Sequence, residues 1–185
     1  MHNVPFHEAR ELIQDGDIVF IHGAWHDPIQ AVIMLCTASE YSHVCIAFWV
    51  ESKVGRHLMC VEAQSRSSRR VLPLSFYSDF HMTIVNAPLP WAEVRDRALA
   101  DVGRASYSLF DAMYVGAYEV IRRLTGRSIP TLSNIREFCS TFVAAVYHLP
   151  NKHVSPQQLY EDLRASDNQL LGVGVYSTNV STNLS

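Results

Sequence analysis

The sequence predicts an α+β fold, in which an antiparallel sheet of about five or six strands packs against helices. Residues 17 to 87 contain short runs that alternate between polar and apolar side chains, as strands do. From residue 91 to 165 the apolar residues recur at helical spacing instead. Strand runs followed by helical runs are typical of α+β proteins. A length of 185 residues, of which 48% are hydrophobic, suits a single domain over residues 1–185 with its core at about 16–165.

The composition argues against a nucleic-acid partner and against export. The formal net charge is −3, and the basic cluster from Arg66 to Arg70 is typical of a solvated loop. Four cysteines without paired spacing favour reduced thiols over a disulfide framework. The longest apolar run, "IQAVIMLCTA", is about half of the roughly 20 residues that a membrane-spanning helix needs, and the acidic first twenty residues do not match a secretory signal. We therefore expect a cytoplasmic protein without an integral membrane segment.

The expected strands lie in the first half of the chain. A short helical pattern in "EARELIQDGD" ends at Asp15–Gly16, after which Ile18 to Ile21 form the first strand. In the second strand, which starts at Ser42, the even-numbered apolar residues form the expected core face, and the odd-numbered residues, His43 among them, face the other way. The third, fourth and fifth strands are expected in "HLMCVEA", "RRVLPLSFY" and "HMTIVNA".

The expected helices follow, apart from a short one over residues 28–38. They cover Trp91 to about Gly103, Leu109 to about Leu124, a segment from Cys139, and a last short helix for which Ser155 and Pro156 supply the N-cap and the first-turn proline. Residues 172–185 are expected to form a strand fragment and a loose tail.

The stretch "REFCSTFVAAVYHLP" singles out Cys139 among the four cysteines. It is followed by apolar residues at helical spacing, which places it near the start of a helix. The positive end of a helix dipole favours the thiolate form of a cysteine, and its unpaired amides can stabilise an oxyanion. Cys139 is therefore a candidate nucleophile.

A cysteine nucleophile needs a base and a group that orients the base. His43 and Glu62 are the candidates, because each lies on an expected strand among apolar neighbours, where a polar side chain has no packing role. The two strands are consecutive, so both side chains can project from one face of the sheet.

Simpler interpretations stay open for the same residues. Cys36, Cys45 and Cys60 are most simply small buried hydrophobic residues. A zinc site built from Cys45, Cys60, His43 and His57 is possible on adjacent strands, although the sequence has no C-x2-C or H-x3-H pair to support it.

Four segments, "GDIVF", "YSHVCIAFW", "CVEAQS" and "FCSTFVAAVY", together resemble the NlpC/P60 superfamily in its circularly permuted branch, the YiiX/YebB-like papain-fold hydrolases. The resemblance spans about Gly16 to Tyr147. In papain and ordinary NlpC/P60 enzymes the cysteine helix precedes the histidine strand. Here His43 precedes Cys139, as in the permuted order.

The resemblance implies a role for each matching residue. Cys139 matches the nucleophile, His43 the general base, and Glu62 the group that orients His43. Tyr107 in "GRASYS" and Ser140 in the C-S segment match positions that contact substrate. Two departures from the family pattern, at Ser108 and Thr141, replace carboxylates and affect the expected substrate contacts.

The resemblance also implies an activity: hydrolysis or transfer at amide or ester carbonyls, through a covalent acyl-enzyme and without a cofactor or metal. Peptidoglycan peptides and lipid-type amides or esters are among the family's substrates. Two other functions stay open. One is a catalytically silent papain-like module that binds a peptide or acyl group, and the other is a metal-binding or structural protein that uses the Cys/His set.

Overall fold

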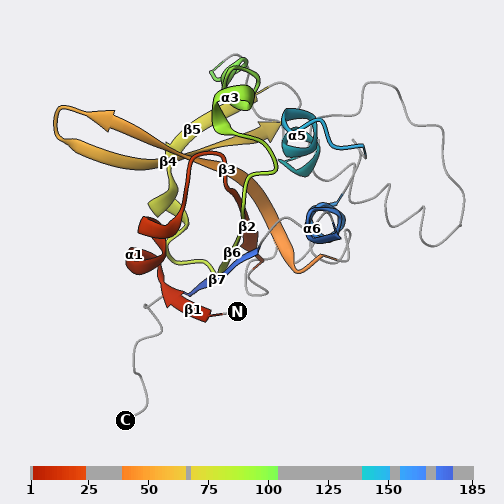
Figure 1. Ribbon diagram of the computed structural model, residues 1–185, viewed down its shortest axis with the longest axis horizontal. Coiled ribbons are helices and arrows are strands. Elements are labelled where there is room, and N and C mark those ends of the chain that lie inside the picture. Colours follow the sequence, from red (N-terminus) through yellow and green to blue (C-terminus); the bar gives the residue numbers. More distant parts are fainter. Residues whose placement is uncertain are drawn as a thin grey trace, which may run out of the picture.

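The computed structural model describes residues 2–23, 39–65, 68–103, 139–150, 155–165 and 170–176. Its strands are β1 (His2–Pro5), β2 (Ile18–His22), β3 (Tyr41–Ser52), β4 (Gly55–Ser65), β5 (Ser68–Pro73), β6 (Met82–Val85) and β7 (Leu170–Tyr176). Its helices are α1 (Phe6–Ala9), α3 (Trp91–Leu99), α5 (Cys139–Val146) and α6 (Pro156–Ala165), with 3-10 turns η1 (Arg10–Leu12) and η2 (Leu74–Tyr77). This mixture of sheet and helices confirms the predicted α+β class (Figure 1).

The described strands form one sheet in the order β1-β7-β6-β2-β3-β4-β5. The five strands from β2 to β6 pair in antiparallel fashion wherever they are neighbours, as predicted. The prediction of five or six strands was too low, because β7 pairs antiparallel with β6 and β1 pairs parallel with β7. Residues 172–176, where a strand fragment was expected, belong to β7, an inner strand of the sheet, and 177–185 lie outside the described residues.

Helix boundaries agree in part with the sequence. The α3 helix begins at Trp91 as predicted but ends at Leu99, and the guanidinium of Arg69 donates hydrogen bonds to the carbonyls of Arg97 and Ala98 in its last turn. The N-cap of α6 is confirmed, since the Gln158 amide donates to the Ser155 hydroxyl at 3.2 Å. The helices expected over 28–38 and Leu109–Leu124 lie outside the described residues.

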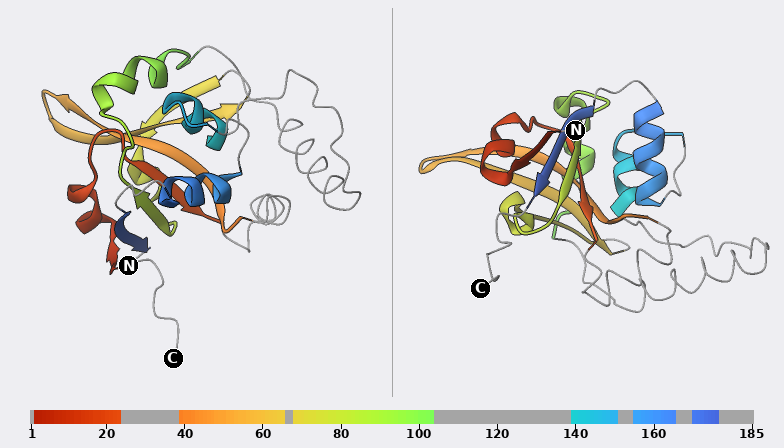
Figure 2. Two further views of the ribbon diagram at one scale, coloured as in Figure 1. Left: turned by 45° about the vertical axis from the view of Figure 1, so that its right-hand side comes forward. Right: turned by 90° about the horizontal axis from the view of Figure 1, so that it is seen from below.

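Both faces of the sheet are buried. On one face, α5 and α6 cover an apolar cluster that includes the expected core residues Val44, Ile46 and Phe48 of β3 (Figure 2). On the opposite face, Cys45 and Ala47 of the same strand are also fully buried, in a second cluster closed by α1 and η2. The sequence pattern predicted only the first of these faces, because small apolar residues alternating with larger ones do not distinguish a covered face from an open one.

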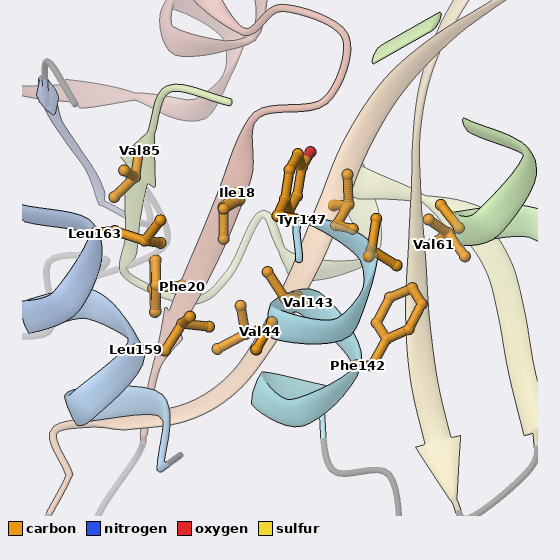
Figure 3. Close-up of a cluster of buried hydrophobic side chains, with 14 of the residues drawn as sticks. Ile18, Phe20, Val44, Val61, Val85, Phe142, Val143, Tyr147, Leu159 and Leu163 are labelled. Carbon is orange, nitrogen blue, oxygen red and sulfur yellow. The ribbon is translucent and has the colours of Figure 1, made fainter. Parts of the chain in front are cut away.

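The α5 helix lies across β3 and β4. In Figure 3, Val143 of α5 points toward Val44 of β3, and Phe142 points toward Val61 of β4. All four side chains are fully buried, so this packing sets the position of the helix relative to the two strands.

A second anchor holds the other end of α5. Gly16 has a φ of +91°, and the hydroxyl of Tyr147, just after α5, donates a hydrogen bond to its carbonyl. The neighbouring carboxylate of Asp17 accepts hydrogen bonds from the amides of Gln14 and Ala87 at 2.8 and 3.2 Å. The "GD" pair therefore joins the start of β2 to α5 and to the segment after β6. Within the described residues, no helix combines the length and apolar character needed to cross a bilayer.

Candidate active site

The site lies where β3 and β4 separate. The ladder between the two strands ends at the pair Ile46–Val61, and beyond it Glu62 of β4 pairs with Arg70 of β5. The α5 helix packs against both β3 and β4 beside this opening (Figure 1). Residues from a strand on either side and from a helix can therefore meet at one point.

His43 and Glu62 face each other across this opening. The imidazole Nε2 lies 2.9 Å from Oε2 of Glu62, a normal hydrogen-bond distance. The Glu62 side chain is 1% exposed, whereas that of His43 is 23% exposed. A shift of register in β3 accompanies this placement, since Ile21 pairs with His43 but His22 pairs with Tyr41. Such irregularities re-aim side chains at the ends of strands.

Three side chains hold the Glu62 carboxylate. Besides His43, the hydroxyl of Tyr77 donates to Oε2 at 2.6 Å, and Nε of Arg70 donates to Oε1 at 2.6 Å. Both oxygens are thus engaged, so the carboxylate is fixed in orientation as well as in position. Tyr77 also lies beside the imidazole, with ring centroids 5.9 Å apart.

These contacts keep Glu62 ionised although it is buried. Burial opposes the charge, but the hydrogen bond and charge of His43, the Tyr77 hydroxyl and the Arg70 guanidinium together lower the pKa of Glu62 to about 2. A buried carboxylate that stays charged at neutral pH can stabilise a protonated imidazole.

Cys139, the first described residue of α5, interacts with His43. It is half-buried and packs against the apolar cluster under α5. Burial opposes protonation of His43, but the charge of Cys139 and a hydrogen bond with it, followed by the hydrogen bond and charge of Glu62, raise the pKa of His43 to about 10. Because Nε2 is bonded to Glu62, Nδ1 is the nitrogen left to face the sulfur.

The structure therefore brings together the three residues singled out in the sequence: Cys139, His43 and Glu62. Ser140 is buried in α5 at 1% exposure, so its side chain does not line an open surface. Tyr107 lies outside the described residues, as does Ser108.

The other cysteines occupy different surroundings. Cys45 and Cys60 are fully buried in the cluster on the opposite face, and a hydrogen bond with Cys60, together with burial, raises the pKa of the Cys45 thiol. Both are therefore poorly placed to react, as expected of packed thiols. Cys36 lies outside the described residues.

The proposed zinc set does not come together. His57 lies on the exposed part of the β3–β4 hairpin, opposite Val50, and its ring bonds to the Ser52 hydroxyl at 3.0 Å. Among the residues that the structure describes, no group of three or more His, Cys, Asp or Glu side chains is arranged to hold a metal ion.

Sequence reasoning missed Arg70 and Tyr77. The basic cluster at residues 66–70 was expected to be a solvated loop that leads into the fourth strand. Arg69 and Arg70 do belong to that strand, β5, but the pairing of Arg70 with Glu62 in the β4–β5 ladder was not expected. An acidic and a basic residue at equivalent places on the two arms of a hairpin are a signal that could have revealed this pair. No comparable signal marks Tyr77, because it reaches Glu62 from a 3-10 turn.

The site has the components of nucleophilic catalysis: a thiol, an imidazole in contact with it, and a carboxylate that orients the imidazole. A scan of the sequence against models of known protein families and a search of curated proteins both found no match. The geometry of the site is therefore the basis for assigning a function.

Proposed function

We propose that this protein is a cysteine hydrolase that uses Cys139, His43 and Glu62 as a catalytic triad. The observation that carries the proposal is the position of His43 between a buried, ionised carboxylate and the Cys139 thiol. We further propose that the fold is a permuted papain-like fold. The order of the strands bearing His43 and Glu62 before the cysteine helix, and the packing of that helix on an antiparallel sheet, support this assignment.

The first half of the proposed reaction forms an acyl-enzyme. His43 Nδ1 takes the proton of the Cys139 thiol, which gives a thiolate and an imidazolium. The Cys139 sulfur attacks the carbonyl carbon of an amide or ester, and the carbonyl π electrons move to the oxygen, which the Cys139 backbone N–H stabilises. When the carbonyl re-forms, the bond to the leaving nitrogen or oxygen breaks. The proton on His43 Nδ1 passes to that leaving atom, and a thioester remains on Cys139.

The second half releases the acid. Neutral His43 takes a proton from a water molecule, whose oxygen attacks the thioester carbon, and collapse breaks the carbon–sulfur bond to regenerate thiolate and imidazolium. Glu62 stabilises the imidazolium in both halves without taking the proton itself, and Arg70 and Tyr77 hold Glu62 in place. Peptidoglycan peptides and lipid-type amides or esters are the substrate classes to test first.

The test is a screen of the purified protein against peptidoglycan fragments, acyl amides and thioesters. We expect turnover by the native protein, no turnover by Cys139→Ala, and slower turnover by Glu62→Gln. His57→Gln is the matched control, because it removes an exposed histidine from the far end of the same hairpin, and it should leave the rate unchanged. Turnover that survives Cys139→Ala would refute the triad. Binding of these compounds without turnover by the native protein would indicate a silent binding module instead.

A further inference from the structure

An exposed cation and an exposed aromatic ring lie beside the triad. The Arg70 side chain is 39% exposed although its Nε is bonded to buried Glu62, and Phe76 of η2 is 62% exposed. The guanidinium carbon of Arg70 lies 5.8 Å from the centre of the Phe76 ring. Phe76 in turn meets Tyr77 edge to face at 5.2 Å, so the pair is continuous with the site.

Arg70 retains donors that the triad does not use. A guanidinium has five N–H groups arranged in a rigid fork, which matches the two oxygens of a carboxylate. Its interactions with other side chains, in the part of the chain that the structure describes, are those with Glu62, Tyr77 and Phe76. Glu62 does not occupy the whole fork, because its Oε2 is taken by His43 and Tyr77 and its Oε1 is bonded to Nε of Arg70.

The proton transfer from His43 to the leaving group indicates which part of a substrate lies near Arg70. His43 protonates the leaving group, so that group lies on the His43 side of the sulfur. Contacts link Cys139 to His43, His43 to Glu62, and Glu62 to Arg70, in a row. The path along these contacts from Nδ1 of His43 to Arg70 is at most about 10 Å long, so a leaving group of roughly three extended residues can reach Arg70.

We propose that Arg70 and Phe76 form a leaving-group subsite that selects a short peptide with a free carboxylate and an apolar terminal side chain. The carboxylate binds the outer nitrogens of Arg70, and the apolar side chain packs on Phe76. This inference rests on the proposed hydrolase function, because the proton transfer from His43 is what identifies the leaving group as the part of the substrate near Arg70.

Product-like peptides test the subsite without any turnover. Ala-Ala-Phe and its C-terminal amide would be titrated into the Cys139→Ala protein, with binding followed by NMR on the backbone amides of Leu74–Tyr77. We expect the free acid to bind about five- to tenfold more tightly than the amide, because a partly exposed guanidinium–carboxylate pair contributes modestly.

Added variants show whether Arg70 is responsible. In the Cys139→Ala background, Arg70→Gln should bind the free acid and the amide with about equal affinity, while Arg70→Lys should keep part of the preference for the acid. Arg56→Gln is the matched control, since Arg56 also stacks on an aromatic ring, that of Trp49, at the far end of the hairpin; it should leave the preference intact. Phe76→Ala, at a side chain that is 62% exposed, should weaken the binding of both peptides about threefold or more.

Equal affinity for acid and amide, no shift of the η2 amides, or a preference that survives Arg70→Gln would each overturn the subsite. Loss of the preference in Arg56→Gln would also overturn it, by showing a general charge effect. Because this measurement needs no catalysis, it can succeed when the hydrolase proposal fails, or fail when turnover is observed.

Discussion

Replacing Glu62 by Gln tests whether the carboxylate stabilises the site as the structure indicates. Gln has the same shape but no charge, so it loses the ion pair with His43 and with Arg70. Glu62 is 1% exposed, and the contacts around it outweigh burial and lower its pKa from 4.5 to about 2. That shift corresponds to about 3 kcal/mol of stability at pH 7. The ion pair between Glu62 and His43 contributes to the pKa shifts of both residues, so its free energy is counted only once.

The sign of the pH dependence follows from the direction of the shift. Because the folded pKa lies below the unfolded value, the stabilisation is fully present above pH 4.5 and is lost as the pH falls toward about 2. By pH 3 about 2 kcal/mol of the difference between the native protein and Glu62→Gln should have disappeared. Urea unfolding of both proteins at pH 7 and at pH 3 measures this change.

Glu51→Gln is the control for this experiment. Glu51 lies on the same hairpin and pairs with Arg56, but its side chain is 79% exposed, so its replacement should change stability by less than about 0.5 kcal/mol. A difference below about 1 kcal/mol for Glu62→Gln at pH 7, or one that is equal at both pH values, would refute this account of the carboxylate.

Three further predictions concern the surroundings of the site. Tyr77→Phe removes a donor from Glu62 and should raise the pKa of that carboxyl group, which carbon-detected NMR measures; an unchanged titration would show that the hydroxyl does not matter. Gly16→Ala should lower the free energy of unfolding by about 1–3 kcal/mol, because φ is +91° and a Cβ there would lie 3.2 Å from the hydroxyl of the tyrosine after α5. Gly55→Ala is the control for backbone strain alone, because Gly55 has a φ of +130° and a Cβ there would meet no other atom. Equal decreases of the melting temperature in the two variants would contradict a role for the contact at Gly16. His22 should stay neutral down to about pH 4, because burial and a second histidine lower its pKa. The folded protein therefore loses stability as the pH falls from 6.5 toward 4. A His22 imidazole that titrates near pH 6.5, as followed by nitrogen NMR, would contradict this prediction.

The strands that form the centre of the sheet were predictable because their apolar residues alternate. In β3, Val44, Ile46 and Phe48 pack in the cluster under α5 and α6 as expected, whereas Val50, also expected on the core face, is 39% exposed. The edge strand β1 and its neighbour β7 were harder to predict, although a strand fragment was expected in residues 172–185. The four residues of β1 include a proline, and β7, "LLGVGVY", is interrupted by glycines, so neither carries the alternating pattern of a strand with one buried face.

The central residues of the site were predictable for a different reason. His43 and Glu62 are polar residues in otherwise apolar strands, and Cys139 precedes an apolar helix, so each is out of place locally. Arg70 and Tyr77 are not, since an arginine in a basic run and a tyrosine in an aromatic segment are ordinary. Their roles follow from the register of the β4–β5 hairpin and from the 3-10 turn after it, which are tertiary features.

In the proposed reaction, Cys139 is a nucleophile activated by His43. The most direct measurement is the rate at which iodoacetamide labels each cysteine at pH 7 in the folded native protein and in His43→Gln, resolved by mass spectrometry of the peptides. In the native protein we expect Cys139 to react well before Cys36, Cys45 and Cys60. In His43→Gln the labelling rate of Cys139 should fall about tenfold or more. Labelling of Cys139 no faster than the buried thiols, or at a rate that His43→Gln leaves unchanged, would contradict the claim and make Cys139 a packing residue of α5.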